Sequence, residues 1–222
     1  MVWSWKSSKH LIGSDFDYYK RIDSSTGFDP HDNAFFFDEK NSCVYLGYRN
    51  LNRIIKIDYP GGKTLSTYGE IFKKGEKETG EGLFCGQHSI GRTQDGYLYY
   101  FNNNSCNNTD SLPTVVMLQE SNSPGGPLKK IWEYACPVDN GYSKKFGSGG
   151  NAIELPDRSL FVNMGSEYSK LFIVNREKKM QWSALPERSI GSDNKWKPAH
   201  VYRASIINRK EVEQLIWNAE SH

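Results

Sequence analysis

The chain has 222 residues, of which 14% are aromatic, and it contains 20 glycines and 9 prolines. This length fits one domain, and an aromatic, turn-rich composition is typical of β proteins and argues against disorder. The formal net charge of +2 supplies no field that would attract nucleic acid or an anionic membrane, and no apolar run approaches the roughly 20 residues of a membrane span, so we expect neither partner.

The chain repeats one pattern of short strands three times. The first copy, 31–69, reads as four strands separated by turns. The second, 87–134, begins with two strands around Asp95-Gly96, a residue pair that suits a tight hairpin. The third copy, 147–187, follows the same order, and a lone strand is predicted at 201–209.

Units of four short antiparallel strands are typical of β-propeller blades, which stack around a central channel. The corresponding points are His31, His88, Asn151 and Ser205. The segment 1–5 is similar to the last strand of the later units, which predicts a blade whose first three strands are absent. Propellers close with about four to eight blades, so we expect part of a larger ring. A truncated chain is favoured over closure by a second copy in a homo-oligomer.

Two of the units begin with a histidine, at the rim where propellers bind ligands. His31 and His88 can each serve as a nucleophile, a general acid or base, or a metal ligand, and the ordinary alternative is a hydrogen-bonded turn residue. Arg49 ends the second strand of the first unit and is expected to return to the end where His31 lies. Together with the two imidazoles and the amide of Asn33, the Arg49 guanidinium could bind a tetrahedral oxyanion, because a guanidinium offers paired donors to adjacent oxygens.

Other site chemistries are less well supported by the sequence. The glycine-rich 147–151 follows no parallel strand and opens no helix, so we expect a flexible approach to the third unit and not a phosphate-binding loop. No Gly-x-Ser-x-Gly nucleophile elbow occurs. Asp32 is the only carboxylate that the sequence places at the rim, and one carboxylate is too few to coordinate calcium. We therefore expect neither a metal nor a cofactor. The cysteines match no zinc pattern and are expected to be buried thiols: Cys43, Cys85, Cys106 and Cys136.

The segments 31–58 and 84–104 resemble the bacterial arylsulfotransferases, also called aryl-sulfate sulfotransferases, which do not use the nucleotide sulfate donor. In that family one blade carries a His-x-Asn-Ser stretch and a strand with an arginine near its end. The next blade carries Gln-His and then a hairpin. The matching positions here are His31, Asn33, Arg49, Gln87, His88 and the turn Asp95-Gly96. The resemblance extends from Trp3 to about Leu215.

The resemblance implies a six-bladed propeller enzyme that moves a sulfuryl group from an aryl sulfate to a phenol in a ping-pong reaction, without a cofactor. His88 would be the nucleophile, while His31, Asn33 and Arg49 would hold the sulfuryl oxygens and stabilise the leaving phenolate. The family acts in the periplasm or outside the cell, although the first residues here show no export signal. Ala34 replaces the usual serine, and a further family histidine from an earlier blade has no counterpart.

Two alternatives come from other functional classes. A propeller that binds a ligand or a protein without chemistry is favoured if His88 is buried and hydrogen-bonded to the backbone. A metal-dependent lactonase or esterase needs acidic ligands converging on the axis. A sulfuryl-transfer enzyme instead requires His31, Arg49 and His88 to lie together at one end of the channel.

Overall fold

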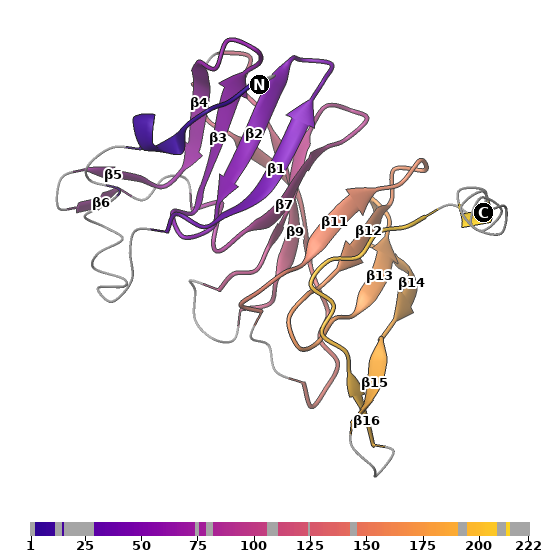
Figure 1. The fold of residues 1–222 in the computed structure, drawn as a ribbon. Coiled ribbons are helices and arrows are strands. Elements are labelled where there is room, and N and C mark those ends of the chain that lie inside the picture. The colour runs from indigo at the N-terminus through magenta and orange to yellow at the C-terminus, as the bar shows by residue number, and fades with distance from the viewer. Residues whose placement is uncertain are drawn as a thin grey trace, which may run out of the picture.

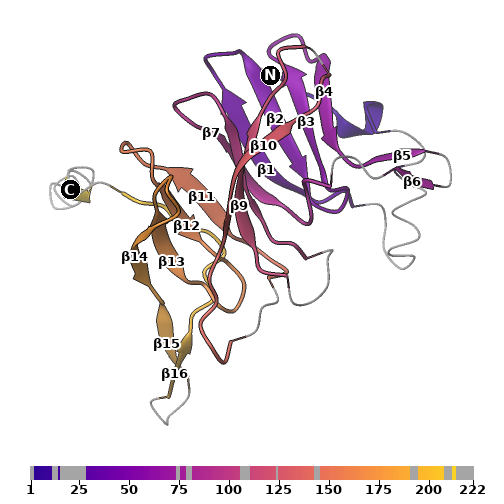
Figure 2. The same cartoon turned by 180° about the vertical axis from the view of Figure 1, so that it is seen from behind.

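The computed structural model consists almost entirely of β-strands (Figures 1 and 2). It describes residues 3–11, 15, 29–73, 76–78, 82–105, 111–123, 125–142, 146–190, 195–207 and 212–213. Within these ranges the strands form three four-stranded sheets and two hairpins, and Ser7–Lys9 forms a short 3-10 helix. No described helix has the length and apolar character needed to cross a membrane.

The three large sheets are antiparallel, and their strands follow one another in chain order. The first sheet comprises β1 (Asp32–Asp38), β2 (Cys43–Tyr48), β3 (Arg53–Asp58) and β4 (Thr64–Gly69). The second comprises β7 (His88–Arg92), β8 (Leu98–Asn102), β9 (Thr114–Gln119) and β10 (Lys129–Ala135). The third comprises β11 (Asn151–Glu154), β12 (Leu160–Asn163), β13 (Leu171–Val174) and β14 (Met180–Ala184). The all-β class and the repeated four-stranded antiparallel sheet are therefore confirmed.

Two hairpins not predicted from the sequence extend from this stack. One joins β5 (Ile71–Lys73) to β6 (Glu76–Glu78), and the other joins β15 (Glu187–Ile190) to β16 (Lys195–Pro198). The second hairpin projects beyond the end of the third sheet (Figure 1). Both segments are polar and short, so their sequences resemble loops.

The second sheet is apolar on both faces because it is packed between the other two. Tyr100 of β8 belongs to the core shared with the first sheet, which includes Tyr45. Its neighbour Phe101 points the other way, into the core shared with the third sheet, which includes Phe172. This reversal is the period of two of a strand. The first strand β7 contacts both β1 and β11, so the three first strands lie side by side.

Polar networks also join neighbouring sheets. Between the first and second sheets, the carboxylate of Glu120 accepts hydrogen bonds from the hydroxyls of Tyr45 and Tyr68 at 2.8 and 2.7 Å and from Lys56 at 3.0 Å. Arg92 of β7 pairs with the same carboxylate. The side chain of Glu120 is mostly buried, and partners from both sheets stabilise its negative charge.

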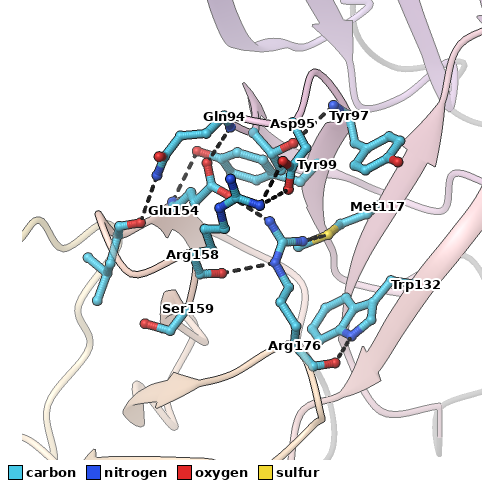
Figure 3. A network of polar contacts seen from close by, with 12 residues as sticks. Gln94, Asp95, Tyr97, Tyr99, Met117, Trp132, Glu154, Arg158, Ser159 and Arg176 are labelled. Carbon is cyan, nitrogen blue, oxygen red and sulfur yellow. Dashed lines mark hydrogen bonds and ion pairs between the residues drawn. The ribbon is translucent and has the colours of Figure 1, made fainter.

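A second network joins the second and third sheets (Figure 3). Arg176 pairs with the carboxylate of Glu154, and its backbone oxygen accepts a 2.8 Å hydrogen bond from the indole of Trp132. The other oxygen of Glu154 accepts from the backbone N–H of Gln94 at 2.6 Å. The turn after β7 is thereby tied to β11.

Two strands expected at the ends of the chain are not found. Residues 3–6 form no strand; Trp3 packs edge-on against Tyr59 with ring centres 5.5 Å apart, and Trp5 stacks on His10 at 4.3 Å. This segment covers the outer face of the first sheet, and residues 1–2 lie outside the described part. The reason is that tryptophans bury more apolar area on a sheet face than at an exposed edge.

The strand predicted at 201–209 is also absent from its described part, 201–207, whereas 208–209 lie outside the described residues. The backbone oxygens of Val201 and Ala204 instead accept hydrogen bonds from the amides of Asn163 and Asn151, at 3.0 and 2.8 Å. Side chains at the ends of β11 and β12 thus replace a strand ladder, and the segment crosses the third sheet (Figure 1).

The cysteines differ in their oxidation state. Cys43 and Cys136 are buried free thiols, as expected, and burial raises the pKa of each. Cys85 forms a disulfide, so the expectation of a thiol is wrong there. The prediction for Cys106 falls outside the described residues.

Candidate functional site

His88 opens β7 beside a β-bulge. His88 pairs with Phe101 and Ile90 pairs with Tyr100, which leaves Ser89 without a cross-strand partner and at a φ of 58°. A bulge turns the side chains next to it away from the regular pleat, and bulges are common beside functional sites. A non-glycine residue in the left-handed region is also costly, so tertiary contacts must hold it there.

Asp32, and not His31, is the counterpart of His88 in the first sheet. Asp32 pairs with Tyr48 of β2 just before a register shift between Asp32 and Ala34. His31 lies one residue upstream at a φ of 56°, and its imidazole is 3.8 Å from the carboxylate of Asp29. Among the described residues, no hydrogen bond, ion pair or ring contact joins the His31 imidazole to His88. The alignment of His31 with His88 was therefore wrong by one residue, a shift that re-aims a side chain in a strand.

The imidazole of His88 is held through Nδ1. This nitrogen lies 2.6 Å from Oδ1 of Asn103 and 3.1 Å from the backbone oxygen of Gly86. The amide nitrogen of Asn103 donates to the backbone oxygen of Gly149 at 3.0 Å, which assigns Oδ1 to the side facing His88. Because both neighbours of Nδ1 are acceptors, Nδ1 carries the proton and Nε2 keeps its lone pair.

Burial keeps this imidazole neutral. His88 is 1% exposed, and desolvation lowers its pKa to about 4, against the opposing effect of the hydrogen bonds to Asn103 and Gly86. The positive charges of Arg49 and Arg203 lower the pKa further. At neutral pH the ring is therefore uncharged, with its one proton on Nδ1 and with Nε2 as the basic and nucleophilic atom.

This pKa has a consequence for stability. Between the ordinary pKa of about 6.5 and the folded pKa of about 4, the unfolded chain binds the His88 proton and the folded chain does not. Unfolding should thus become easier as pH falls through this window, by roughly 3 kcal/mol from this group. Urea denaturation between pH 7 and pH 4 should show a shallower pH dependence in His88→Gln. Equal slopes in the two proteins would contradict the buried neutral imidazole.

Arg49 lies at the same end of the first sheet as His31, as the sequence predicted. Its backbone N–H donates to the backbone oxygen of His31 at 3.0 Å, so the β1–β2 hairpin returns it there. Its guanidinium donates to Asn50 at 3.0 Å and to the backbone oxygen of Gly147 at 2.8 Å. Among the described residues no carboxylate pairs with it, and burial lowers its pKa. Its charge is therefore available to an anion.

The C-terminal segment supplies two groups that the sequence analysis missed. The guanidinium of Arg203 donates to the backbone oxygen of Asn33, and no described carboxylate forms an ion pair with it. The ring of Tyr202 lies edge-on to His88, with ring centres 6.2 Å apart. The sequence signal for this pair is an aromatic residue next to a basic residue, but it falls in a segment that is predicted to be a regular strand.

Asn33 supports the backbone beside His88. Its amide nitrogen donates to the backbone oxygen of Gln87 at 2.8 Å. Its buried Oδ1 has no hydrogen-bond partner in the described structure. Gln87 donates in turn to the backbone oxygens of Tyr48 and Arg53 at 3.2 and 3.1 Å. The binding role expected for Asn33 stays a prediction.

The structure thus places the charges of Arg49 and Arg203 close enough to His88 to affect its pKa. The backbone oxygen of His31 contacts Arg49, but among the described residues its imidazole is joined only to Asp29 and not to His88. Two guanidinium groups without carboxylate partners beside a neutral imidazole favour a bound anion. Among the described residues no group of three or more histidine, cysteine, aspartate or glutamate side chains is placed to hold a metal ion.

No family model matches the chain, and no curated protein matches it. Among solved structures, the chain is similar to virginiamycin B lyase from Staphylococcus aureus, with 14% identity and a TM-score of 0.46 over 77% of this chain and 49% of that one. A streptogramin B lyase has 13% identity and a TM-score of 0.43 over 76% of this chain and 47% of that one. BamB from Moraxella catarrhalis has 13% identity and a TM-score of 0.41 over 72% of this chain and 40% of that one. The chain spans less than half the length of each of these three structures.

Proposed function

We propose that this chain forms part of a β-propeller that transfers a sulfuryl group from an aryl sulfate to a phenol through His88. The propeller is supported by three four-stranded antiparallel sheets whose first strands lie side by side. The reaction is supported by the resemblance of 31–58 and 84–104 to the arylsulfotransferases. The observation that carries the proposal is the state of His88: neutral, protonated on Nδ1, with a lone pair on Nε2.

In the first step Nε2 attacks the sulfur of the aryl sulfate. The N–S bond forms as the bond between sulfur and the aryl oxygen breaks, and the phenolate leaves with the electron pair and takes a proton from water. In the second step the oxygen of the acceptor phenol attacks the same sulfur. The N–S electrons return to Nε2, and the phenol proton passes to solvent. Nδ1 keeps its proton throughout, held by Asn103 and Gly86.

Arg49 and Arg203 would stabilise the negative charge in both steps. The transferred group carries three oxygens, and a guanidinium donates to two of them in a fixed geometry. The donors of Arg49 that are not used by Asn50 and Gly147 can serve this purpose. Such preorganised donors act most strongly where water is excluded, as it is around His88.

A second candidate is a propeller that binds an anionic ligand without chemistry. The burial of His88 and its hydrogen bond to the backbone oxygen of Gly86 favour it. In that case the imidazole has a structural role, and the arginines bind the ligand.

The experiment that separates these candidates uses 4-nitrophenyl sulfate. With phenol present, we expect release of 4-nitrophenolate that depends on the acceptor. With the donor alone, we expect a mass increase of the protein by one SO3 group, located on His88 by peptide mapping. Saturable binding of the donor without release or adduct would exclude sulfuryl transfer by this chain and favour the second candidate.

A further inference from the structure

A pocket lies outside the His88 cluster. It has a volume of about 690 Å³ and is bordered on one side by the hairpin β15–β16 and on the other by the loops before β11 and β13. This size is usual for a small-molecule site. Gly147 lines the pocket, and its backbone oxygen accepts a hydrogen bond from Arg49, so the two sites are neighbours without sharing a functional side chain.

The hairpin presents two positive charges to this pocket. Arg188 of β15 is the direct cross-strand partner of Lys197 of β16, and both side chains line the pocket. Like charges that face each other across a strand pair are destabilising. In the described part of the chain neither residue forms an ion pair with a carboxylate. One carboxylate, Glu167, also lines the pocket, so the cations outnumber it. A bound anion would relieve the repulsion between Arg188 and Lys197.

The opposite wall is aromatic and fixed. The rings of Tyr142 and Tyr168 lie with their centres 4.6 Å apart. The hydroxyl of Tyr168 donates to the carboxylate of Asp139, which Lys170 also contacts at 2.8 Å. Tyr168 is therefore held in place and is 3% exposed, whereas Tyr142 is 38% exposed. Tyr142 is thus backed by a buried ring and has an accessible surface on which a planar group can stack.

We propose that this pocket binds a small aromatic anion. The ring of the ligand stacks on Tyr142, and its sulfonate, sulfate, carboxylate or phosphate group lies between Arg188 and Lys197. Ile190, on the same face of the hairpin as Arg188, supplies further apolar contact. This proposal uses none of the side chains of the His88 cluster and does not rest on sulfuryl transfer.

The test measures binding by isothermal titration calorimetry with benzenesulfonate. Its carbon–sulfur bond prevents sulfuryl transfer, so binding is read separately from any chemistry. Phenol and methanesulfonate serve as probes for the ring and the charge alone. We expect benzenesulfonate to bind more tightly than either of them and to weaken as salt is raised, because the charge contacts are partly screened. Equal affinity for benzenesulfonate and phenol would overturn the proposal.

Substitutions then locate the bound probe. Arg188→Gln and Lys197→Gln should each weaken benzenesulfonate binding about tenfold, the effect of losing a charge-assisted hydrogen bond. Tyr142→Leu should weaken it, whereas Tyr142→Phe, which keeps the ring, should not. The matched control is Lys179→Gln, which removes the same charge from an exposed turn outside the pocket and should leave binding unchanged.

Variants of the other site separate this proposal from the proposed function. Binding of benzenesulfonate that persists in Arg49→Gln but is lost in Lys197→Gln supports the pocket, whether or not the protein transfers sulfuryl groups. Binding that is lost in Arg49→Gln and unchanged in Lys197→Gln, with both proteins folded by circular dichroism, would place the probe at the His88 cluster and overturn the proposal.

Discussion

His88→Ala should abolish the acceptor-dependent release of 4-nitrophenolate, lowering kcat by at least about a thousandfold, because removal of a covalent nucleophile eliminates both steps of the reaction. The site keeps its two guanidinium groups in this variant. The donor should therefore still bind, and the loss should appear in kcat more than in KM. Steady-state kinetics with 4-nitrophenyl sulfate and phenol measure both parameters.

The matched control is His10→Ala. His10 stacks on Trp5 and contacts Thr64 at 3.2 Å, in the segment that covers the outer face of the first sheet. The His10→Ala variant should release 4-nitrophenolate at the rate of the parent protein. Added imidazole is expected to restore part of the release in His88→Ala by occupying the vacated space. Full activity in a folded His88→Ala protein would rule out transfer through this histidine.

Glu120→Ala should lower the free energy of unfolding by about 3–5 kcal/mol, the usual cost of removing one partner from a buried charge network. Arg92 keeps a second carboxylate, Asp38, at 2.7 Å. The ammonium group of Lys56 lies 3.0 Å from the Glu120 carboxylate and would lose this partner. The Lys56 side chain is only 20% exposed, so water would replace the partner poorly. The hydroxyls of Tyr45 and Tyr68 would lose their acceptor as well. Urea denaturation at pH 7 measures the difference.

A matched control for this substitution is Glu133→Ala. Glu133 pairs with Lys130 at 2.7 Å, but the two side chains are 39% and 47% exposed. Removal of this pair should cost about 0–1 kcal/mol, because solvent screens surface charges. Equal effects of the two substitutions would show that Glu120 does not hold the first two sheets together.

The pH dependence of the same network has a definite sign. Burial raises the pKa of Glu120, but hydrogen bonds from Tyr68 and Lys56 outweigh burial, and the net pKa is lowered. A carboxyl whose pKa is lowered by folding stabilises the folded state above its ordinary pKa, and this stabilisation is lost as pH falls through the folded pKa. The difference in stability between the parent and Glu120→Gln should accordingly shrink in acid. A constant difference from pH 7 to pH 3 would contradict this sign.

The repeated four-stranded unit could be predicted from local sequence patterns. Alternating apolar residues and turn pairs such as Asp95-Gly96 act over a few residues, and the four-stranded sheets follow from them. Gly96 has a φ of 88° and closes the predicted hairpin through Thr93 and Tyr97. The same local logic placed His88 at a strand start and Arg49 at the end of its hairpin.

Which residues meet at the site depends on how the sheets pack, and local patterns do not contain this information. The first ladder pair of β1 is Asp32 with Tyr48 and that of β7 is His88 with Phe101, so Asp32 and not His31 corresponds to His88. Arg203 reaches Asn33 across 170 residues of sequence, a contact that no local pattern encodes. The tautomer of His88 likewise depends on acceptors from separate segments. Strand patterns are short-range, whereas bulge register, long-range packing and proton position arise only when the sheets assemble.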